Sequence, residues 1–172
     1  SHVISSINTG LNPRDNFILG NGDIQYLTVK NLTTSGTIDF SGCDTVDEQA
    51  REIIHKRSDV SVGDILFASI APLGRCYLIQ NPPEKWDINV TSEFLYMYFI
   101  SDTFIKAATS SSTGSIFKGI RINTLLDIAA VIPPKDIVTA FTTQVKTLLA
   151  LKEQKGTENR ELTKLRDWLL PM

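Results

Sequence analysis

The chain has 172 residues, of which 42% are hydrophobic and 21% are charged, and its formal net charge is −2. This composition is typical of one soluble globular unit that buries a real core, and it excludes indiscriminate nucleic-acid binding through a basic tail, so any DNA contact must come from a local face. No apolar run reaches the ~18 residues of a membrane-spanning helix and no signal peptide opens the chain, so we expect a cytoplasmic protein without a membrane partner.

Short strand-like runs alternate with turn residues in the part of the chain before residue 135. β-branched and aromatic residues fill these runs, and Gly, Asn, Asp and Pro separate them. Two other stretches, residues 46–57 and 92–109, have helical character, the second with Ser92 as its N-cap. We therefore expect an α+β domain over residues 3–134, with a mixed or antiparallel, β-rich sheet. Its expected strands are residues 24–32, 36–40, 64–71, 76–79, 87–90 and 127–132.

The stretch GDILFASIAPLGRCYLI, residues 63–79, predicts a buried hairpin. Two apolar runs, Ile65 to Ala71 and Cys76 to Ile79, flank the connection Pro72-Leu73-Gly74-Arg75. Proline and glycine make such a connection tight. It places the Arg75 guanidinium where we expect it to meet DNA, and the alternative is an ion pair between Arg75 and one of the acidic residues.

The hydrophobic pattern changes to a helical period after Ile132-Pro133-Pro134. Apolar residues, Val145 among them, recur in steps of three and four and predict one protruding helix over about 136–170, within a second unit of residues 135–172. A helix of ~33 residues is roughly 50 Å long, which a domain of this size does not cover. Its apolar seam therefore needs another helix. The residues of this expected interface are Leu148, Leu151, Leu162, Leu165 and Leu169.

The residues offer no convincing active site. Asn81-Pro82-Pro83 matches the start of an amino-methyltransferase motif, but Glu84 stands where an aromatic side chain would stack on a flipped base. Cys43 and Cys76 have no CxxC spacing, so they are two reduced thiols or, at most, one disulfide. We expect no catalytic residue, no metal and no cofactor.

What remains is a set of basic residues in Gly-, Ser- and Asn-rich connections. For any one of them, a solvated surface cation is the simpler interpretation. Together they matter more, because such connections let backbone N–H groups approach phosphates while Arg or Lys reaches guanine in the major groove. We predict a shared DNA-binding face made of Arg14, Lys30, Arg75, Lys118 and Arg121.

Five stretches, taken in order, resemble the specificity subunit of type I restriction-modification systems. They are ISSINTGLNPRDNF, YLTVKNL, VSVGDILFASIAPLGRCYLI, STGSIFKGIRINTLLDIAAVIPP and LKEQKGTENRELTKLRDWLLPM. The resemblance covers essentially the whole chain and corresponds to one half of that subunit, a target recognition domain with one spacer helix. It implies a non-catalytic protein that reads one half of a bipartite site in double-stranded DNA. It also implies docking of methylation subunits and, through them, of restriction subunits.

In that family two long helices pair antiparallel and hold two recognition domains apart. The resemblance therefore implies antiparallel pairing here, either in a homodimer or with the other half of a longer subunit. The seam becomes polar at Lys155 and Glu158, and Gly156 between them weakens the helix by about 1 kcal/mol. A twofold axis at this point would set Lys155 of one chain near Glu158 of the other. Two other functions stay open: a protein-interaction scaffold that does not read DNA, and an enzyme that the motifs do not reveal.

Overall fold

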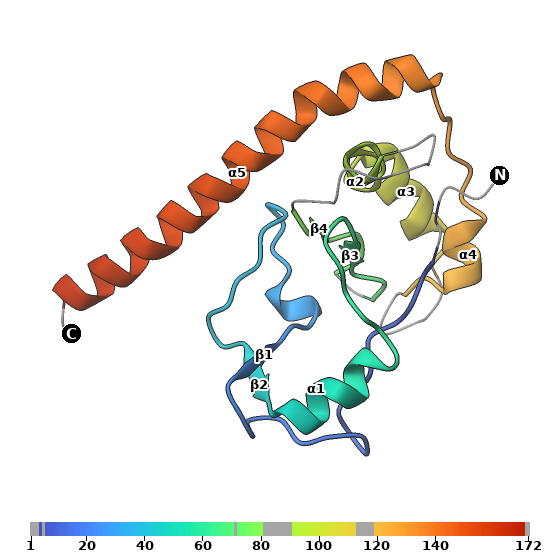
Figure 1. Cartoon of the computed structure of the whole chain (residues 1–172). Helices are drawn as coiled ribbons and strands as arrows, with labels where there is room; N and C mark the ends of the chain where they lie inside the picture. The colour runs from blue at the N-terminus through green and yellow to red at the C-terminus, as the bar shows by residue number, and fades with distance from the viewer. Residues whose placement is uncertain (1–3, 5, 71, 81–90, 113–118, 171–172) are drawn as a thin grey trace.

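The computed structural model describes residues 4, 6–70, 72–80, 91–112 and 119–170. It is a mixed α/β structure with two small antiparallel sheets and a long C-terminal helix (Figure 1). The strands are β1 (Ile24–Tyr26), β2 (Asp44–Val46), β3 (Ile65–Phe67) and β4 (Cys76–Leu78). The helices are the 3-10 helix η1 (Val29–Asn31), α1 (Glu48–His55), α2 (Ser92–Phe99), α3 (Asp102–Ser110), α4 (Ile122–Leu126) and α5 (Lys135–Leu169).

The strands are shorter and fewer than the sequence pattern predicted, so the expectation of a β-rich domain was overstated. Among the described residues, β1 pairs only with β2 and β3 only with β4, each through three residues. Residues 36–40 contribute a single bridge, Leu32 to Ile38, and residues 127–132 form no strand. Ile128 packs against the core without a ladder partner, because hydrophobic burial does not by itself provide a neighbouring strand. The strand expected at 87–90 lies outside the described residues.

The helix expected over residues 92–109 is two helices, α2 and α3, which are separated at Ser101. The Ser101 hydroxyl donates to a carbonyl in the last turn of α2 at 2.6 Å and accepts from the Phe104 N–H at 3.3 Å. One side chain thus helps to end α2 and caps α3. The predicted N-cap, Ser92, is the first residue of α2, and the cap itself is Thr91.

The β3–β4 hairpin has both of its faces covered. Side chains point alternately to opposite faces of a strand. Ile65 and Phe67 therefore pack against the main core, with α2, α3 and α5, whereas Leu66 and Tyr77 pack against a smaller cluster of Leu32, Ile38 and Ala68. The predicted hairpin is confirmed, but it is only partly buried, since Cys76 and Leu78 of β4 are buried and β3 is half-buried. Gly63 (φ 93°) begins it, and its N–H donates to the Ile79 carbonyl at 2.8 Å.

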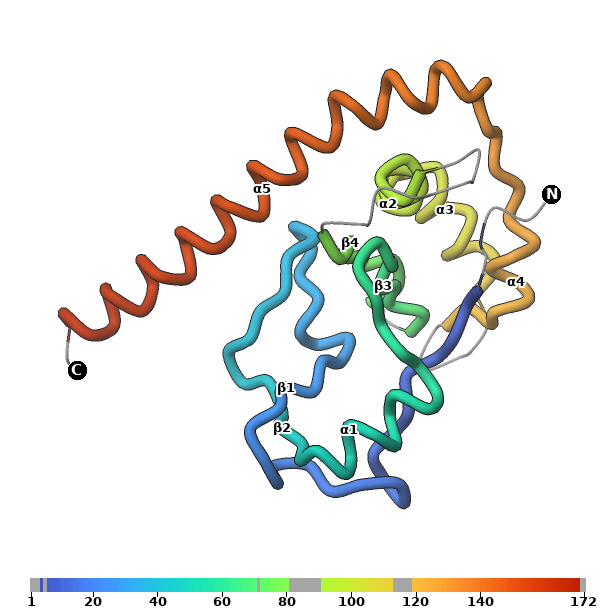
Figure 2. The backbone as a smooth tube through the Cα atoms, viewed as in Figure 1, coloured from blue at the N-terminus to red at the C-terminus, as the bar shows by residue number. Residues whose placement is uncertain are grey.

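The long C-terminal helix is confirmed as α5, but only its distal part protrudes. Val138, Val145 and Leu149 are buried, so the proximal half of α5 belongs to the core. Val145 was wrongly assigned to the exposed seam, because helical spacing alone does not distinguish two apolar sides of one helix. Residues 161–170 are all exposed, and Figure 2 shows this end of α5 running clear of the other segments. No helix in the described part of the chain is long and apolar enough to cross a membrane.

Candidate functional site

The predicted DNA-binding cations lie on separate segments of the fold. Arg14 is exposed in the turn that the Asn16 N–H closes onto the Pro13 carbonyl, and Lys30 is exposed in η1. Arg121 is exposed at the N-cap position of α4, and Lys118 lies outside the described residues. Whether these residues share a DNA-facing surface stays a prediction.

The Arg75 side chain makes a hydrogen bond within the protein, whereas the sequence analysis expected it to meet DNA or to pair with a carboxylate. Its Nη1 donates to the Leu32 carbonyl at 2.9 Å, and its own carbonyl accepts from the Ala68 N–H at 2.8 Å. The guanidinium therefore ties the hairpin to the segment that follows η1. In the described part of the chain it forms no ion pair with a carboxylate, and its Nε is buried without a hydrogen-bond partner. A base contact made by Nη1 would cost the bond to Leu32.

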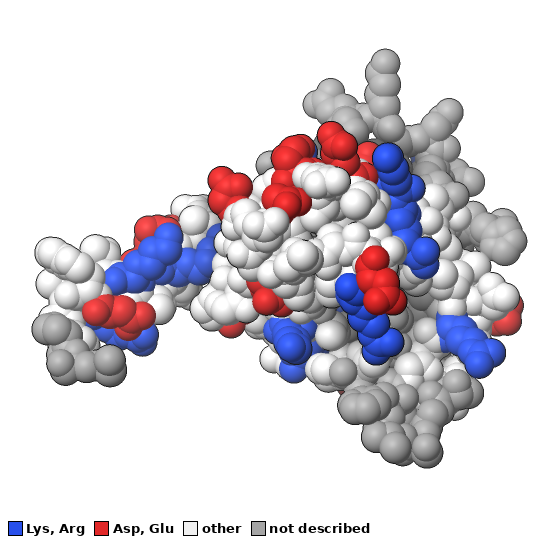
Figure 3. All heavy atoms as spheres, turned by 90° about the horizontal axis from the view of Figure 1, so that it is seen from below, with Lys and Arg blue, Asp and Glu red and all other residues white. Residues whose placement is uncertain are grey.

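Side chains of both charges are present on the face drawn in Figure 3. Lys and Arg side chains lie on the protruding helix and at scattered places on the domain, and Asp and Glu side chains lie near several of them and gather along one edge of the domain. Exposed ion pairs such as Arg51 with Glu48, at 2.6 Å, and Lys164 with Glu161, at 2.9 Å, are examples of this local neutralisation. Such pairs contribute only ~0–1 kcal/mol each to stability, but they remove free positive charge from the surface.

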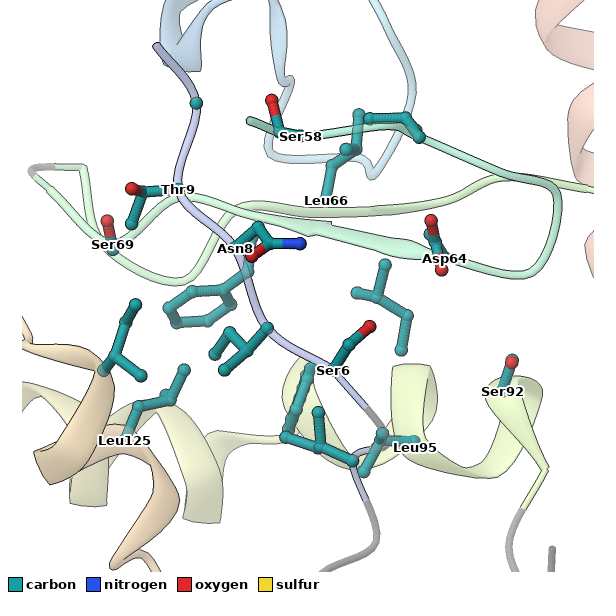
Figure 4. Close-up of a pocket in the computed structure, with 18 of the residues that line it drawn as sticks. Ser6, Asn8, Thr9, Ser58, Asp64, Leu66, Ser69, Ser92, Leu95 and Leu125 are labelled. Atoms are coloured by element: carbon teal, nitrogen blue, oxygen red, sulfur yellow. The ribbon is translucent and has the colours of Figure 1, made fainter. Parts of the chain in front are cut away.

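A cavity of about 620 Å³ lies among the N-terminal segment 6–10, the β3–β4 hairpin, α2 and α4 (Figure 4). Apolar side chains such as Leu95 and Leu125 line it together with the polar Ser6 and Asn8. Asp64 also lines it, with its carboxylate accepting from the Ser61 N–H at 2.8 Å. Its described lining includes no His, Cys or Lys, and its ionisable side chains are those of Asp59, Asp64 and Arg121.

A second cavity, of about 360 Å³, brings together residues that the sequence did not connect. Lys152 of α5 donates from Nζ to the Tyr96 hydroxyl of α2 at 3.2 Å, and Arg75 lines the same space. Burial raises the pKa of Tyr96 to about 12 and lowers the pKa of Lys152 below its usual value. Lys152 and Tyr96 are 56 positions apart in the chain, so no local motif could have indicated this site.

The expected helix-pairing residues form an apolar stripe on α5. The exposed fractions of the five leucines run from 49% at Leu151 to 64% at Leu148 and Leu169. Trp168 extends the stripe near its end and is 78% exposed. In the polar middle of the stripe, Lys155 Nζ lies 2.7 Å from a Glu158 carboxylate oxygen of the same helix. The stripe is thus open from Leu148 to Leu169, and the buried residues Val145 and Leu149 lie on another side of the same helix.

No protein-family profile matches the chain, and no curated protein matches its sequence. Over the described residues, no group of three or more His, Cys, Asp or Glu side chains is placed to hold a metal ion. The features that carry a functional argument are the stripe on α5 and the exposed basic residues of the loops.

Proposed function

We propose that this protein is the DNA-recognition module of a type I restriction-modification complex and performs no chemistry itself. In this proposal residues 3–134 read one half of a bipartite target, and α5 is the spacer that pairs with another helix. The assembled module docks the methylation and restriction subunits. The observation that carries the proposal is the exposed apolar stripe of α5, and the resemblance of the five sequence stretches supports its DNA-reading part.

The stripe has the spacing of a coiled-coil seam and a symmetry of its own. Its positions advance in steps of three and four, as a and d positions do. The six positions from Leu148 to Leu165 are also symmetric about the point between Gly156 and Thr157, whereas Leu169 would face Gln144. In an antiparallel pair of identical helices centred there, a positions of one helix meet d positions of the other. The facing pairs are then Leu148 with Leu165, Leu151 with Leu162, and Lys155 with Glu158.

Charge favours this antiparallel arrangement over a parallel one. A parallel, in-register pair would set Lys155 against Lys155 and Glu158 against Glu158, and like charges at facing positions repel. The antiparallel pair places opposite charges together and sets Leu148 and Leu151 against Leu165 and Leu162. The existing Lys155–Glu158 pair within each helix is exposed and contributes little, so exchanging partners costs little. We therefore take a second copy of this chain as the partner of α5.

Burial of the stripe is large enough to drive pairing. Each leucine that passes from water into an interface contributes ~1.5–3 kcal/mol before the cost of association is subtracted. Monomeric proteins rarely leave an apolar stripe of this extent uncovered.

Analytical ultracentrifugation at micromolar concentrations tests the pairing. We expect the wild type to sediment as a dimer, Leu151→Asp to sediment as a monomer, and Ala150→Asp, an exposed position outside the stripe, to remain dimeric. Lys155→Glu should weaken the dimer, and the double variant Lys155→Glu/Glu158→Lys should restore it. A monomeric wild type, or no rescue by the charge exchange, would contradict the antiparallel arrangement.

DNA reading is tested by selection from randomised duplexes followed by salt-dependent binding measurements. A base-reading residue changed to alanine should lose ~1–3 kcal/mol of binding free energy and relax the selected sequence at one position. A phosphate contact should weaken all sequences alike and reduce the salt dependence. The variants are Arg14→Ala, Lys30→Ala and Arg121→Ala, and the control is Lys106→Ala, an exposed lysine of α3. Selection without a consensus sequence would refute sequence-specific reading.

A protein-interaction scaffold is the second candidate function. Two observations favour it: the presence of both charges on the face drawn in Figure 3, and the use of the Arg75 guanidinium within the fold. A scaffold predicts that the dimer forms as above while duplex selection yields no consensus. The two experiments together therefore separate the candidates.

A further inference from the structure

The apolar seam of α5 continues towards the domain beyond the five leucines. The same steps of four and three residues, counted back from Leu148, lead to Gln144, Phe141 and Ile137. Phe141 is 37% exposed and Ile137 is 54% exposed, although both belong to the half of α5 that packs on the core. The surface that a second helix can cover therefore reaches the part of α5 that is attached to the domain.

Phe141 is also supported from behind by the domain. The Phe94 ring of α2 stands edge-on to the Phe141 ring, with 5.8 Å between the ring centroids and 78° between the ring planes, which is a favourable aromatic arrangement. In the next residue of α5, the Thr142 hydroxyl lies 2.6 Å from that of Thr91, the N-cap of α2. A side chain that packs on the exposed part of Phe141 would therefore rest on a residue that α2 holds in place.

The distal end of α5 has apolar side chains that its own chain leaves uncovered. Leu169 is a seam position, and Trp168 and Leu170 flank it. Residues 161–170 are all exposed, and Figure 1 shows this end of the helix far from the domain. Monomeric proteins rarely leave such a group of large apolar side chains open to water. We call residues 166–170 the tip of α5.

The antiparallel register proposed above decides what Leu169 meets. Leu169 of one copy is level with Gln144 of the other, and each seam residue of a coiled coil fits into a hole between four residues of the facing helix. The hole opposite Leu169 is formed by Phe141, Gln144, Val145 and Leu148. Gln144 is polar, and Val145 is buried against its own core. Phe141 and Leu148 are therefore the exposed apolar side chains that Leu169 can pack against.

We propose that the tip of α5 docks on the domain end of a second copy of this chain, with Leu169 of one copy packed against Phe141 of the other. The proposal rests on the antiparallel pairing. Twofold symmetry repeats the contact, so each helix is held by its own domain at one end and by the partner's domain end at the other. This fixes the orientation of the two domains, which pairing at the middle of the helices alone would leave free to swing.

Disulfide trapping tests which residue lies opposite the tip. In a Cys43→Ser background, Gln144→Cys/Leu169→Cys should give a covalent dimer on mild oxidation, because facing seam positions lie within the reach of a disulfide. The matched pair Gln144→Cys/Leu162→Cys should not, since Leu162 is about two turns of helix away from Leu169. Leu169→Cys alone should also stay uncrosslinked, whereas a parallel pair would link it to itself. Non-reducing electrophoresis reads all three variants.

A double-mutant cycle on the dimer dissociation constant, measured by sedimentation, tests the contact itself. Leu169→Ala and Phe141→Ala should each weaken the dimer about tenfold or more, because each change is made twice in the dimer. The double variant should lose little more than the weaker of the two single variants, since the two side chains share one contact. Lys164→Ala, on the side of the tip turned away from the seam, should dimerise as the wild type does.

The outcomes separate this docking from the pairing on which it rests. A wild type that stays monomeric would overturn both. A wild-type dimer in which the two losses multiply, or in which Gln144→Cys/Leu169→Cys forms no cross-link, would overturn the docking of the tip, while the charge exchange at Lys155 and Glu158 would still report on the pairing. Because Leu169 is exposed in the single chain, Leu169→Ala keeps the test open even if Phe141→Ala destabilises the domain.

Discussion

Leu148 and Leu149 are adjacent on α5 but serve different interfaces, and replacing each by alanine tests this division. Leu149 is 7% exposed and packs in the main core, whereas Leu148 is 64% exposed on the stripe. Truncating a buried leucine removes its transfer free energy and leaves a cavity, at a cost of ~2–5 kcal/mol. Truncating an exposed side chain usually changes stability by less than about 0.5 kcal/mol. We therefore expect Leu149→Ala to lower the free energy of unfolding strongly and Leu148→Ala to leave it nearly unchanged in the monomer.

Urea unfolding followed by circular dichroism measures both effects. It should be done at protein concentrations low enough to keep the chain monomeric, because dimer formation makes apparent stability depend on concentration. At higher concentration, Leu148→Ala should weaken self-association, as measured by sedimentation. A cost below ~1 kcal/mol for Leu149→Ala would show that α5 does not dock on the core in this register. Equal costs for the two variants in the monomer would refute the two-sided description of the helix.

Two further predictions concern side chains whose pKa is shifted by burial. Burial raises the pKa of the Cys76 thiol to about 12, whereas Cys43 is only half-buried. Timed alkylation of the native protein should therefore label Cys43 well before Cys76. Equal labelling of the two cysteines, measured by mass spectrometry, would contradict this. Burial also raises the pKa of Tyr96 from 10.0 to about 12. The protonated Tyr96 therefore stabilises the folded state fully below pH 10. This stabilisation, ~2–3 kcal/mol of unfolding free energy, is lost as the pH rises towards about 12. The lowered pKa of Lys152 acts in the opposite sense, because folding then favours its neutral form as pH rises, and partly offsets this loss. Urea unfolding across this pH range should show a smaller alkaline loss for Tyr96→Phe than for the wild type, and identical profiles would contradict the assignment to Tyr96.

Features that depend on neighbours along the chain could be predicted from the sequence. The apolar period after Pro134 predicted α5, and its length is reproduced within a residue at each end. The run-turn-run pattern of residues 63–79 predicted the β3–β4 hairpin. The exposure of the five stripe leucines also follows the predicted pattern. In each case the information lies within a few turns of helix or one hairpin, where spacing determines which side chains share a face.

Tertiary structure decided the features that join distant segments. Helical spacing marks both Val145 and Leu148 as apolar face residues, but only the position of the core separates the buried side of α5 from the open stripe. The bond from Arg75 to Leu32 spans 43 positions and the bond from Lys152 to Tyr96 spans 56, so no motif joins these residues before the chain folds. The short strands have the same origin, because an apolar run becomes a long strand only when a second run of matching length lies beside it. Local periodicity therefore determined the helix and the hairpin, while the packing of distant segments against one another decided which side chains face the core, the cavities and the solvent.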